Sequence, residues 1–229
     1  MSTVQVDAIN ESTTNAGVTV DGVLIKDNAV NTDTITEKTS GSGVTIDGAL
    51  VKDSKVAPSA GGSLVLLSSN TVSGSSSVSV DNIFTSAYTN YKVIMTIRGS
   101  HTGVQYHTMK LRTGGSNNSS NLYTSGARTY RISSDIEFEQ RVHEGTDWKL
   151  NGWLGSQANN TVSDDLTIYG PAVARRTQIS GTFITDEVGD QQTGYLGGSY
   201  EADTTFDGLS VICLGGTFTG QINIYGLGE

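Results

Sequence analysis

The sequence is poor in cysteine, proline and charge. It has one cysteine, two prolines and 16% charged residues, whereas an ordinary soluble domain has about 25% charged residues. The single cysteine, Cys213, cannot form an internal disulfide, and this excludes metal or redox motifs built on paired cysteines. Because Cys213 lies in the apolar run Leu209–Leu214, we interpret it as an inert thiol of the core.

Long apolar runs and an excess of positive charge are also missing. No stretch of 18 apolar residues occurs, so no transmembrane helix is expected. The N-terminus has neither a basic region nor an apolar stretch, which predicts a protein made in the cytoplasm without a secretory signal. The net charge of −9 would repel phosphate backbones. We therefore expect no membrane insertion and no nucleic-acid partner.

Glycine and uncharged polar residues take the place of the missing charges. Glycine alone accounts for 28 of the 229 residues, and clusters of helix-favouring residues are rare, which favours β-structure. Short apolar or alternating segments separated by turn residues predict twelve strands: Leu64–Ser68, Ser77–Val80, Tyr91–Arg98, Gln105–Arg112, Thr129–Ser133, Ile136–Val142, Trp148–Leu154, Asp165–Tyr169, Thr177–Thr185, Gly194–Tyr200, Leu209–Leu214 and Gln221–Tyr225. This pattern indicates an all-β fold, a two-sheet antiparallel sandwich with jelly-roll-like connections.

An internal duplication precedes these strands. Residues 6–30 and 32–56 align at an offset of 26 residues with 13 of 25 positions identical. Each copy has a short β-branched segment, an Asp-Gly pair and a second short apolar segment. Asp-Gly favours the positive φ of a tight turn, so each copy is expected to form a β-hairpin.

One 26-residue copy has too few apolar side chains to offset the entropy of ordering its backbone, and repeat arrays usually need three or more units. We therefore expect the missing apolar surface to come from other copies of the chain, as an intertwined trimeric stalk. The alternative is a flexible linker rich in glycine, serine and threonine. The stalk interpretation assigns the following residues to the trimer axis: Val18, Val20, Leu24, Val44, Ile46 and Leu50.

These patterns divide the chain into three parts. Residues 1–57 are a repeat-containing attachment or stalk segment, and residues 58–63 are a linker because Pro58 is followed by a Gly-Gly pair. Residues 64–229 form the sandwich, here called the tip domain.

The repeat motif, from Glu37 to Asp53, resembles the repeats of tail-fibre and other virion-appendage proteins of marine and cyanobacterial bacteriophages. The tip domain is similar to the β-sandwich tips of such proteins in Thr89–Val93, Phe206–Leu209 and the ending Gly216–Leu227, whereas residues 113–165 match no part of them. The resemblance implies a trimeric virion protein with an N-terminal attachment region, other virion proteins as partners and a distal tip. Most such fibres are much longer, which leaves room for a capsid decoration or knob-like protein.

The sequence provides little for catalysis. No Gly-x-Ser-x-Gly elbow occurs. A glycosidase needs two carboxylates across a cleft, and none of the candidate acids stands in a distinctive motif; they are Glu137, Glu139, Asp164, Asp165, Asp186 and Glu187. We expect no enzyme and no cofactor, and keep a polysaccharide depolymerase as the weakest alternative.

Histidine offers no metal site within one chain. His101 and His107 are six residues apart, about 20 Å along a strand, and His143 is distant in sequence. An ion could be shared only where copies of one histidine meet on a three-fold axis.

Recognition of a host-surface glycan is the remaining chemistry. Aromatic rings stack on sugar faces while amides bind hydroxyl groups, and three segments combine these groups: Thr113–Tyr123, His143–Asn160 and Asp186–Gly194. The candidate receptor-binding residues are Asn117, Asn118, Tyr123, Trp148 and Trp153. Of these, Tyr123 is the better candidate for an exposed position. The two tryptophans are favoured as core residues over receptor contacts, because residues five apart on one strand face opposite sides and at least one of them then lies in the core.

Overall fold

The computed structural model of the 229-residue chain describes residues 40, 44–46, 49–52, 55–56, 64–100, 105–132, 136–154, 160–186 and 191–228. The chain divides into two compact units, Met1–Ala57 and Pro58–Glu229. The described part consists of strands, turns and irregular segments and contains no helix.

In the first unit the structure describes three short strands, β1 (Val44–Ile46), β2 (Ala49–Lys52) and β3 (Lys55–Val56). β1 pairs with β2 in an antiparallel register that places Val44 opposite Val51, and β2 pairs with β3. The first copy of the repeat, with Val18, Val20 and Leu24, lies outside the described residues. So do the side chains of Val44, Ile46 and Leu50, and the stalk stays a prediction.

The second unit holds the remaining strands. They are β4 (Leu64–Ser75), β5 (Ser77–Val80), β6 (Asn90–Ser100), β7 (Gln105–Thr113), β8 (Ser116–Asn117), β9 (Tyr123–Arg131), β10 (Ile136–Gly145), β11 (Trp148–Leu154), β12 (Thr161–Tyr169), β13 (Arg175–Asp186), β14 (Gln192–Thr204), β15 (Gly208–Cys213) and β16 (Thr217–Leu227). Each of the twelve strands expected from the sequence overlaps one of these.

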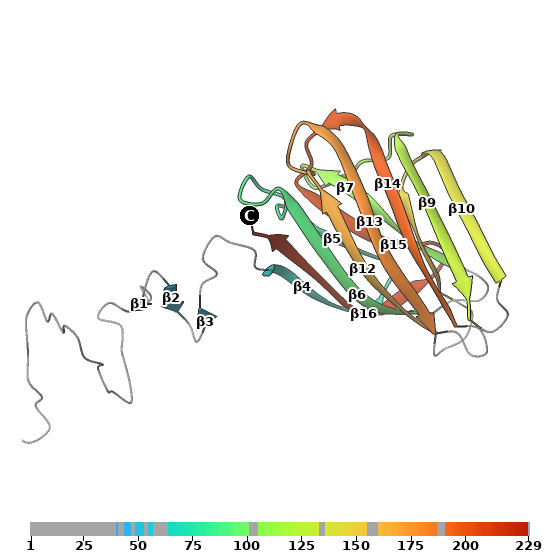
Figure 1. Ribbon diagram of the computed structural model, residues 1–229, viewed down its shortest axis with the longest axis horizontal. Helices are drawn as coiled ribbons and strands as arrows, with labels where there is room; N and C mark the ends of the chain where they lie inside the picture. The colour runs from blue at the N-terminus through green and yellow to red at the C-terminus, as the bar shows by residue number, and fades with distance from the viewer. Residues whose placement is uncertain are drawn as a thin grey trace, which may run out of the picture. The chain divides into compact units, whose positions relative to one another are not determined.

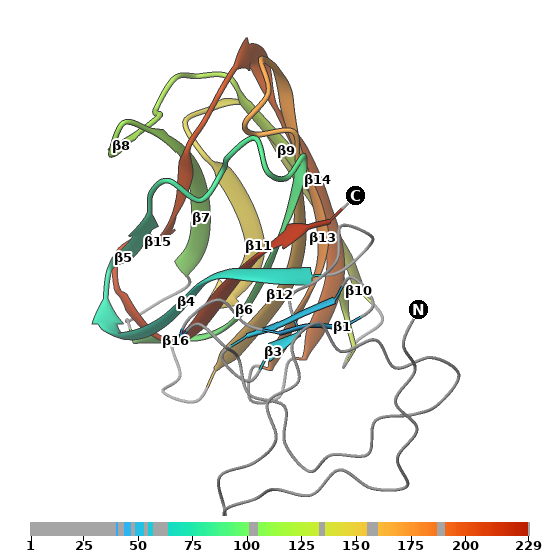
Figure 2. The same ribbon diagram turned by 90° about the vertical axis from the view of Figure 1, so that its left-hand side faces the viewer.

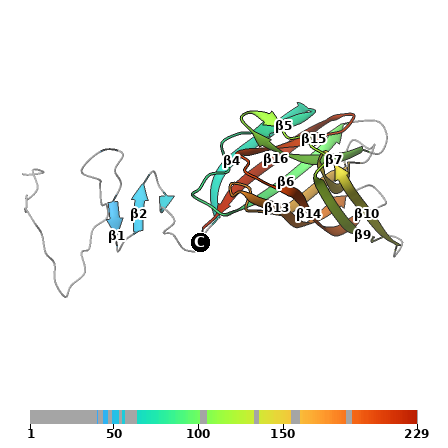
Figure 3. The ribbon, with the colours of Figure 1, turned by 90° about the horizontal axis from the view of Figure 1, so that it is seen from above.

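The strands form two antiparallel sheets that face each other (Figure 1). The large sheet has eight strands in the order β10-β9-β14-β13-β12-β6-β16-β4, and the small sheet has β11-β7-β15-β5 with β8 paired to β7. Figures 2 and 3 show the small sheet lying over one face of the large one. This confirms the all-β antiparallel class and is consistent with a sandwich. The other face of the large sheet is here called its outer face.

Alternation of apolar and polar side chains explains why these segments become strands of a sandwich. In β6, Tyr91, Val93, Met95 and Ile97 are buried, and the residues between them are more exposed. β12 repeats the pattern. Since successive side chains of a strand point to opposite faces, such strands have one face in the core and one in water.

A chain of four aromatic rings crosses the core and ties the sheets together. The ring of Trp148 on β11 of the small sheet meets Tyr123 on β9 of the large sheet edge to face, with 5.4 Å between centroids. Tyr123 contacts Tyr200 at 5.1 Å, and Tyr200 contacts Phe206 at 5.0 Å. Cys213 is buried, as expected for a core thiol, and its burial raises the pKa of the thiol.

Two differences from the expected strands are informative. β9 begins at Tyr123, six residues before the expected Thr129. It is a strand because β10 and β14 pair with it on both sides. β8 was not expected either; Gly114 and Gly115, both with positive φ, turn the chain so that Arg112 pairs with Asn117.

Candidate functional site: a pocket on the outer face of the large sheet

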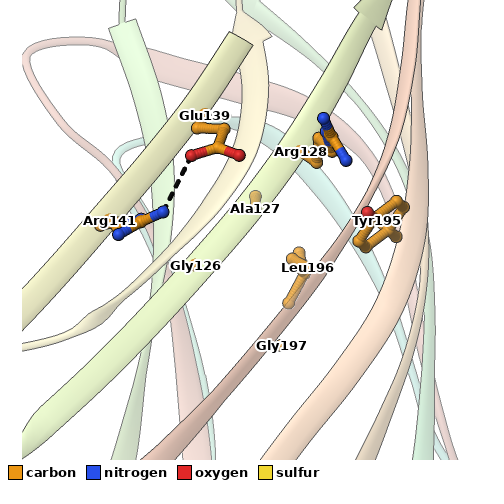
Figure 4. A pocket seen from close by; sticks show the side chains of 8 residues that line it. All are labelled: Gly126, Ala127, Arg128, Glu139, Arg141, Tyr195, Leu196 and Gly197. Carbon is orange, nitrogen blue, oxygen red and sulfur yellow. Dashed lines mark hydrogen bonds and ion pairs between the residues drawn. The ribbon is translucent and has the colours of Figure 1, made fainter. Parts of the chain in front are cut away.

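An open pocket lies on the outer face of the large sheet, over the neighbouring strands β10, β9 and β14 (Figure 4). Its volume is about 370 Å³, which is at the lower end of the range of about 300–1,000 Å³ typical of small-molecule sites. The residues that line it are Gly126, Ala127, Arg128, Glu139, Arg141, Tyr195, Leu196 and Gly197.

Strand register brings these residues together, although they come from positions up to about 70 residues apart. Arg128 of β9 lies between Glu139 of β10 and Tyr195 of β14, and these three residues form a first row across the strands. A second row lies two residues further along each strand. In the second row Gly126 lies between Arg141 and Gly197. Because paired residues of an antiparallel sheet project to the same face, the side chains of the first row and Arg141 surround a floor made by the two glycines. Figure 4 shows this bare floor between β10 and Tyr195.

No packing constraint requires glycine at the floor position 197. A Cβ added there would meet a single atom within 4 Å, the carbonyl oxygen of Ile179 at 3.8 Å. The contrast with two other glycines of β14 is clear: a Cβ would lie 2.2 Å from the Arg128 carbonyl oxygen at Gly194 and 2.4 Å from the Thr124 carbonyl oxygen at Gly198. A glycine inside a strand that packing does not need often marks a place where a ligand approaches the backbone.

The rim of the pocket carries aromatic and charged groups. The Tyr195 side chain is 50% exposed. The guanidinium of Arg141 donates from Nη2 to Glu139 Oε2 at 3.0 Å, and both side chains are mostly in water. An ion pair with this exposure contributes about 0–1 kcal/mol to stability, so a ligand can compete with Glu139 for Arg141 at little cost.

The structure corrects the sequence-based expectation for Tyr123. Its side chain is fully buried rather than exposed. Its hydroxyl accepts a hydrogen bond from the Leu111 backbone N–H at 3.0 Å and donates to the Asn118 carbonyl oxygen at 3.2 Å. Burial raises the pKa of Tyr123. A side chain held in this way cannot contact a receptor.

Trp148 belongs to the core, one of the two interpretations that the sequence allowed. It is fully buried, and its indole N–H donates to the Ser199 carbonyl oxygen at 3.1 Å. This hydrogen bond joins β11 of the small sheet to β14 of the large sheet. Trp148 is therefore no receptor contact, and the side chain of Trp153 lies outside the described residues.

Asn117 and Asn118 have structural partners. Asn117 Oδ1 accepts from Arg112 Nη1 at 2.6 Å and from Ser210 Oγ at 2.7 Å. Asn118 Nδ2 donates to the Tyr200 hydroxyl at 3.1 Å. These bonds secure the β7–β8 turn by engaging Asn117 Oδ1 and Asn118 Nδ2. The receptor role that the sequence suggested for the two residues stays a prediction.

The candidate acids and histidines are also dispersed. His107 Nε2 lies 2.9 Å from Asp164 Oδ2, and both side chains are fully buried between the sheets. Asp165 pairs with Lys92 on the outer face at 2.6 Å, and His143 is exposed. His101, Glu187 and the side chain of Glu137 lie outside the described residues. Where the structure describes the chain, no three His, Cys, Asp or Glu side chains gather to hold a metal ion.

Sequence reasoning singled out Glu139 in this pocket, as a candidate acid, but missed Arg128, Arg141 and Tyr195. The binding segments expected from the sequence were chosen as loops, whereas the pocket lies on three neighbouring strands. One signal was available: Gly194, Gly197 and Gly198 interrupt a strand that also carries Tyr195, and glycine in a strand suggests close approach of a ligand or of another backbone.

Comparison with known proteins adds no relative: no protein-family model, no curated protein and no solved structure matches the chain. Among the residues that the structure describes, no helix is long and apolar enough to cross a membrane.

Proposed function

We propose that this protein is a structural component of a bacteriophage particle, a short trimeric tail fibre whose tip binds a glycan of the host surface. Residues 1–57 join the fibre to other virion proteins, and the sandwich presents the receptor-binding surface. The observation that carries the proposal is a division within one chain. A duplicated segment with few apolar residues precedes a sandwich that has its own core and an open pocket on a solvated face.

The strand order supports a jelly-roll assignment for the sandwich. The chain alternates between the sheets, so that the large sheet contains the order β4-β16-β6-β12 and the small sheet the matching order β5-β15-β7-β11. The first strands therefore pair with the last ones, as in a jelly roll, where a long hairpin winds across both sheets. The hairpin β9–β10 and the strands β13–β14 are additions that widen the large sheet. The pocket lies on these additions.

The pocket is better suited to binding than to hydrolysis. Its lining residues include a single carboxylate, that of Glu139, whereas canonical glycosidases use two. Three such pockets on one trimer would act together, and the combined avidity would exceed the affinity of one site by orders of magnitude.

Deleting residues 1–57 tests the attachment function. We expect the truncated protein to keep its fold, because every buried core residue that the structure describes lies in the second unit. We expect it to be absent from purified particles of a phage that encodes it. Protein blots of the particles and far-UV circular dichroism of the purified fragment are the measurements. Unchanged incorporation would contradict the attachment role of this segment.

A further inference from the structure

We propose that the pocket binds a saccharide that carries an anionic group, and that neutral sugars bind it weakly. The inference rests on the proposed function, since it names the class of glycan that the tip recognises. It follows from the charge of the rim, the bare floor and the position of Tyr195.

The pocket gathers cationic groups on an acidic chain. Two arginines and one glutamate line it, on a protein of net charge −9. The Arg141 side chain is 82% exposed, and the guanidinium fork matches two oxygens of a carboxylate or phosphate. An anionic ligand would replace Glu139 as the partner of Arg141.

The floor has room for a flat ring. Gly126 and Gly197 lie directly opposite each other in the register of β9 and β14, so no side chain separates a ligand from the sheet. An interior strand glycine costs about 0.5–1 kcal/mol of stability relative to alanine, and the space around Gly197 provides no structural reason for that cost. Ligand binding would explain the glycine, because a ring lying on the floor would contact the backbone and remain within reach of both arginines.

Tyr195 completes the site. Its half-exposed ring adjoins the floor and presents an apolar face to the C–H groups of a sugar, while its hydroxyl can bind a sugar hydroxyl. A simple inorganic anion would use the arginines but not the ring. The combination of ring and arginines selects a sugar with a charged group.

The experiment is a titration of the full-length protein with three disaccharide probes, followed by calorimetry or by NMR. The probes are digalacturonate, its neutral analogue digalactose and a phosphorylated disaccharide. We expect at least one anionic probe to bind tenfold or more tightly than digalactose, and the stronger of the two identifies the anionic group as carboxylate or phosphate. Equal binding of all three would overturn the charge inference while leaving glycan recognition in place.

Matched variants place the ligand. Arg141→Gln and Gly197→Val are each expected to weaken binding of the preferred probe at least fivefold. Arg98→Gln is the control for charge, because Arg98 is exposed on β6 of the same sheet, and it should leave binding unchanged. Tyr195→Ala should also weaken binding, whereas Tyr130→Ala, on the neighbouring strand β9 and 38% exposed, should not.

Two further outcomes would count against the proposal. If the pocket variants bind as the wild type does, the ligand binds elsewhere and the site is wrong. If no probe binds at millimolar concentration, the inference fails, and particle incorporation of the truncated chain then decides the attachment function separately.

Discussion

His107 and Asp164 form a fully buried polar contact between the two sheets. Each side chain is fully buried, and each comes from a different sheet, β7 and β12. A carboxylate in the core is tolerated only when it is paired, since removing one partner of a buried pair leaves the other uncompensated. The contact joins the sheets at a position that apolar side chains would otherwise fill.

We predict that His107→Leu lowers the free energy of unfolding by about 3–5 kcal/mol, because removing one partner of a buried polar pair leaves the carboxyl group of Asp164 without its hydrogen-bond partner. The double variant His107→Leu/Asp164→Leu should recover most of that loss, since apolar replacement of a buried pair is often neutral. Urea unfolding followed by tryptophan fluorescence measures both. A loss below about 1 kcal/mol in the single variant would show that the pair contributes little.

Arg112 and Asp81 provide a second residue-scale prediction, about pH. Arg112 donates to the two carboxylate oxygens of Asp81 at 2.6 and 3.2 Å, which lowers the pKa of Asp81. A lowered pKa in the folded state contributes stability above the ordinary value of about 3.9, and the contribution is lost as pH falls through the folded value.

We therefore expect the wild type to lose more stability than Asp81→Asn between pH 6 and pH 3, as measured by the urea midpoint at each pH. The difference should be modest, because Asp81 is partly exposed and solvent screens the interaction. Asp203→Asn, which removes an exposed acid on β14, is the control and should lose as much stability as the wild type between pH 6 and pH 3. Identical pH dependence of all three proteins would contradict the assigned role of the Arg112–Asp81 contact.

At the scale of the element, β14 carries glycines with two different functions. Gly194 faces the core, where its missing side chain admits the Arg128 carbonyl oxygen and the ring of Phe183. Gly197 faces water on the pocket floor. The same residue type, three positions apart in one strand, is structural in the first case and, by our proposal, functional in the second.

Alanine substitutions separate these two functions. Gly194→Ala is expected to destabilise the protein by about 1–3 kcal/mol, because overpacking forces backbone and side chains to move. Gly197→Ala should be neutral or stabilising by up to about 1 kcal/mol, because alanine has less backbone freedom to lose. Thermal unfolding of the two variants measures both changes in stability. Equal destabilisation would show that Gly197 also has a packing role.

At the scale of the whole molecule, the prediction concerns assembly. Val20→Asp together with Ile46→Asp should weaken the proposed trimer, because it would place uncompensated charges at a packed axis. Light scattering of the full-length wild type should give a mass near three times 24.1 kDa. The double variant should give a lower mass at micromolar concentration.

Two outcomes of this measurement would change the interpretation. A double variant that remains trimeric would contradict a packed axis at these positions. A monomeric wild type would favour the alternative in which residues 1–57 lie on the capsid lattice as part of a decoration protein.

The amino-acid sequence by itself determined the strands and the fold class. The alternation that buries Tyr91, Val93 and Met95, and the turn at Gly114–Gly115, are local properties that a strand shows wherever it is placed. Only the tertiary structure decided which strands are neighbours, because pairing depends on contacts between distant segments. It extended β9 back to Tyr123 and buried Tyr123 and Trp148. It also brought Arg128, Glu139 and Tyr195 into one row. Burial of an aromatic ring and the outline of a pocket are set by register across strands, and no local pattern encodes that register.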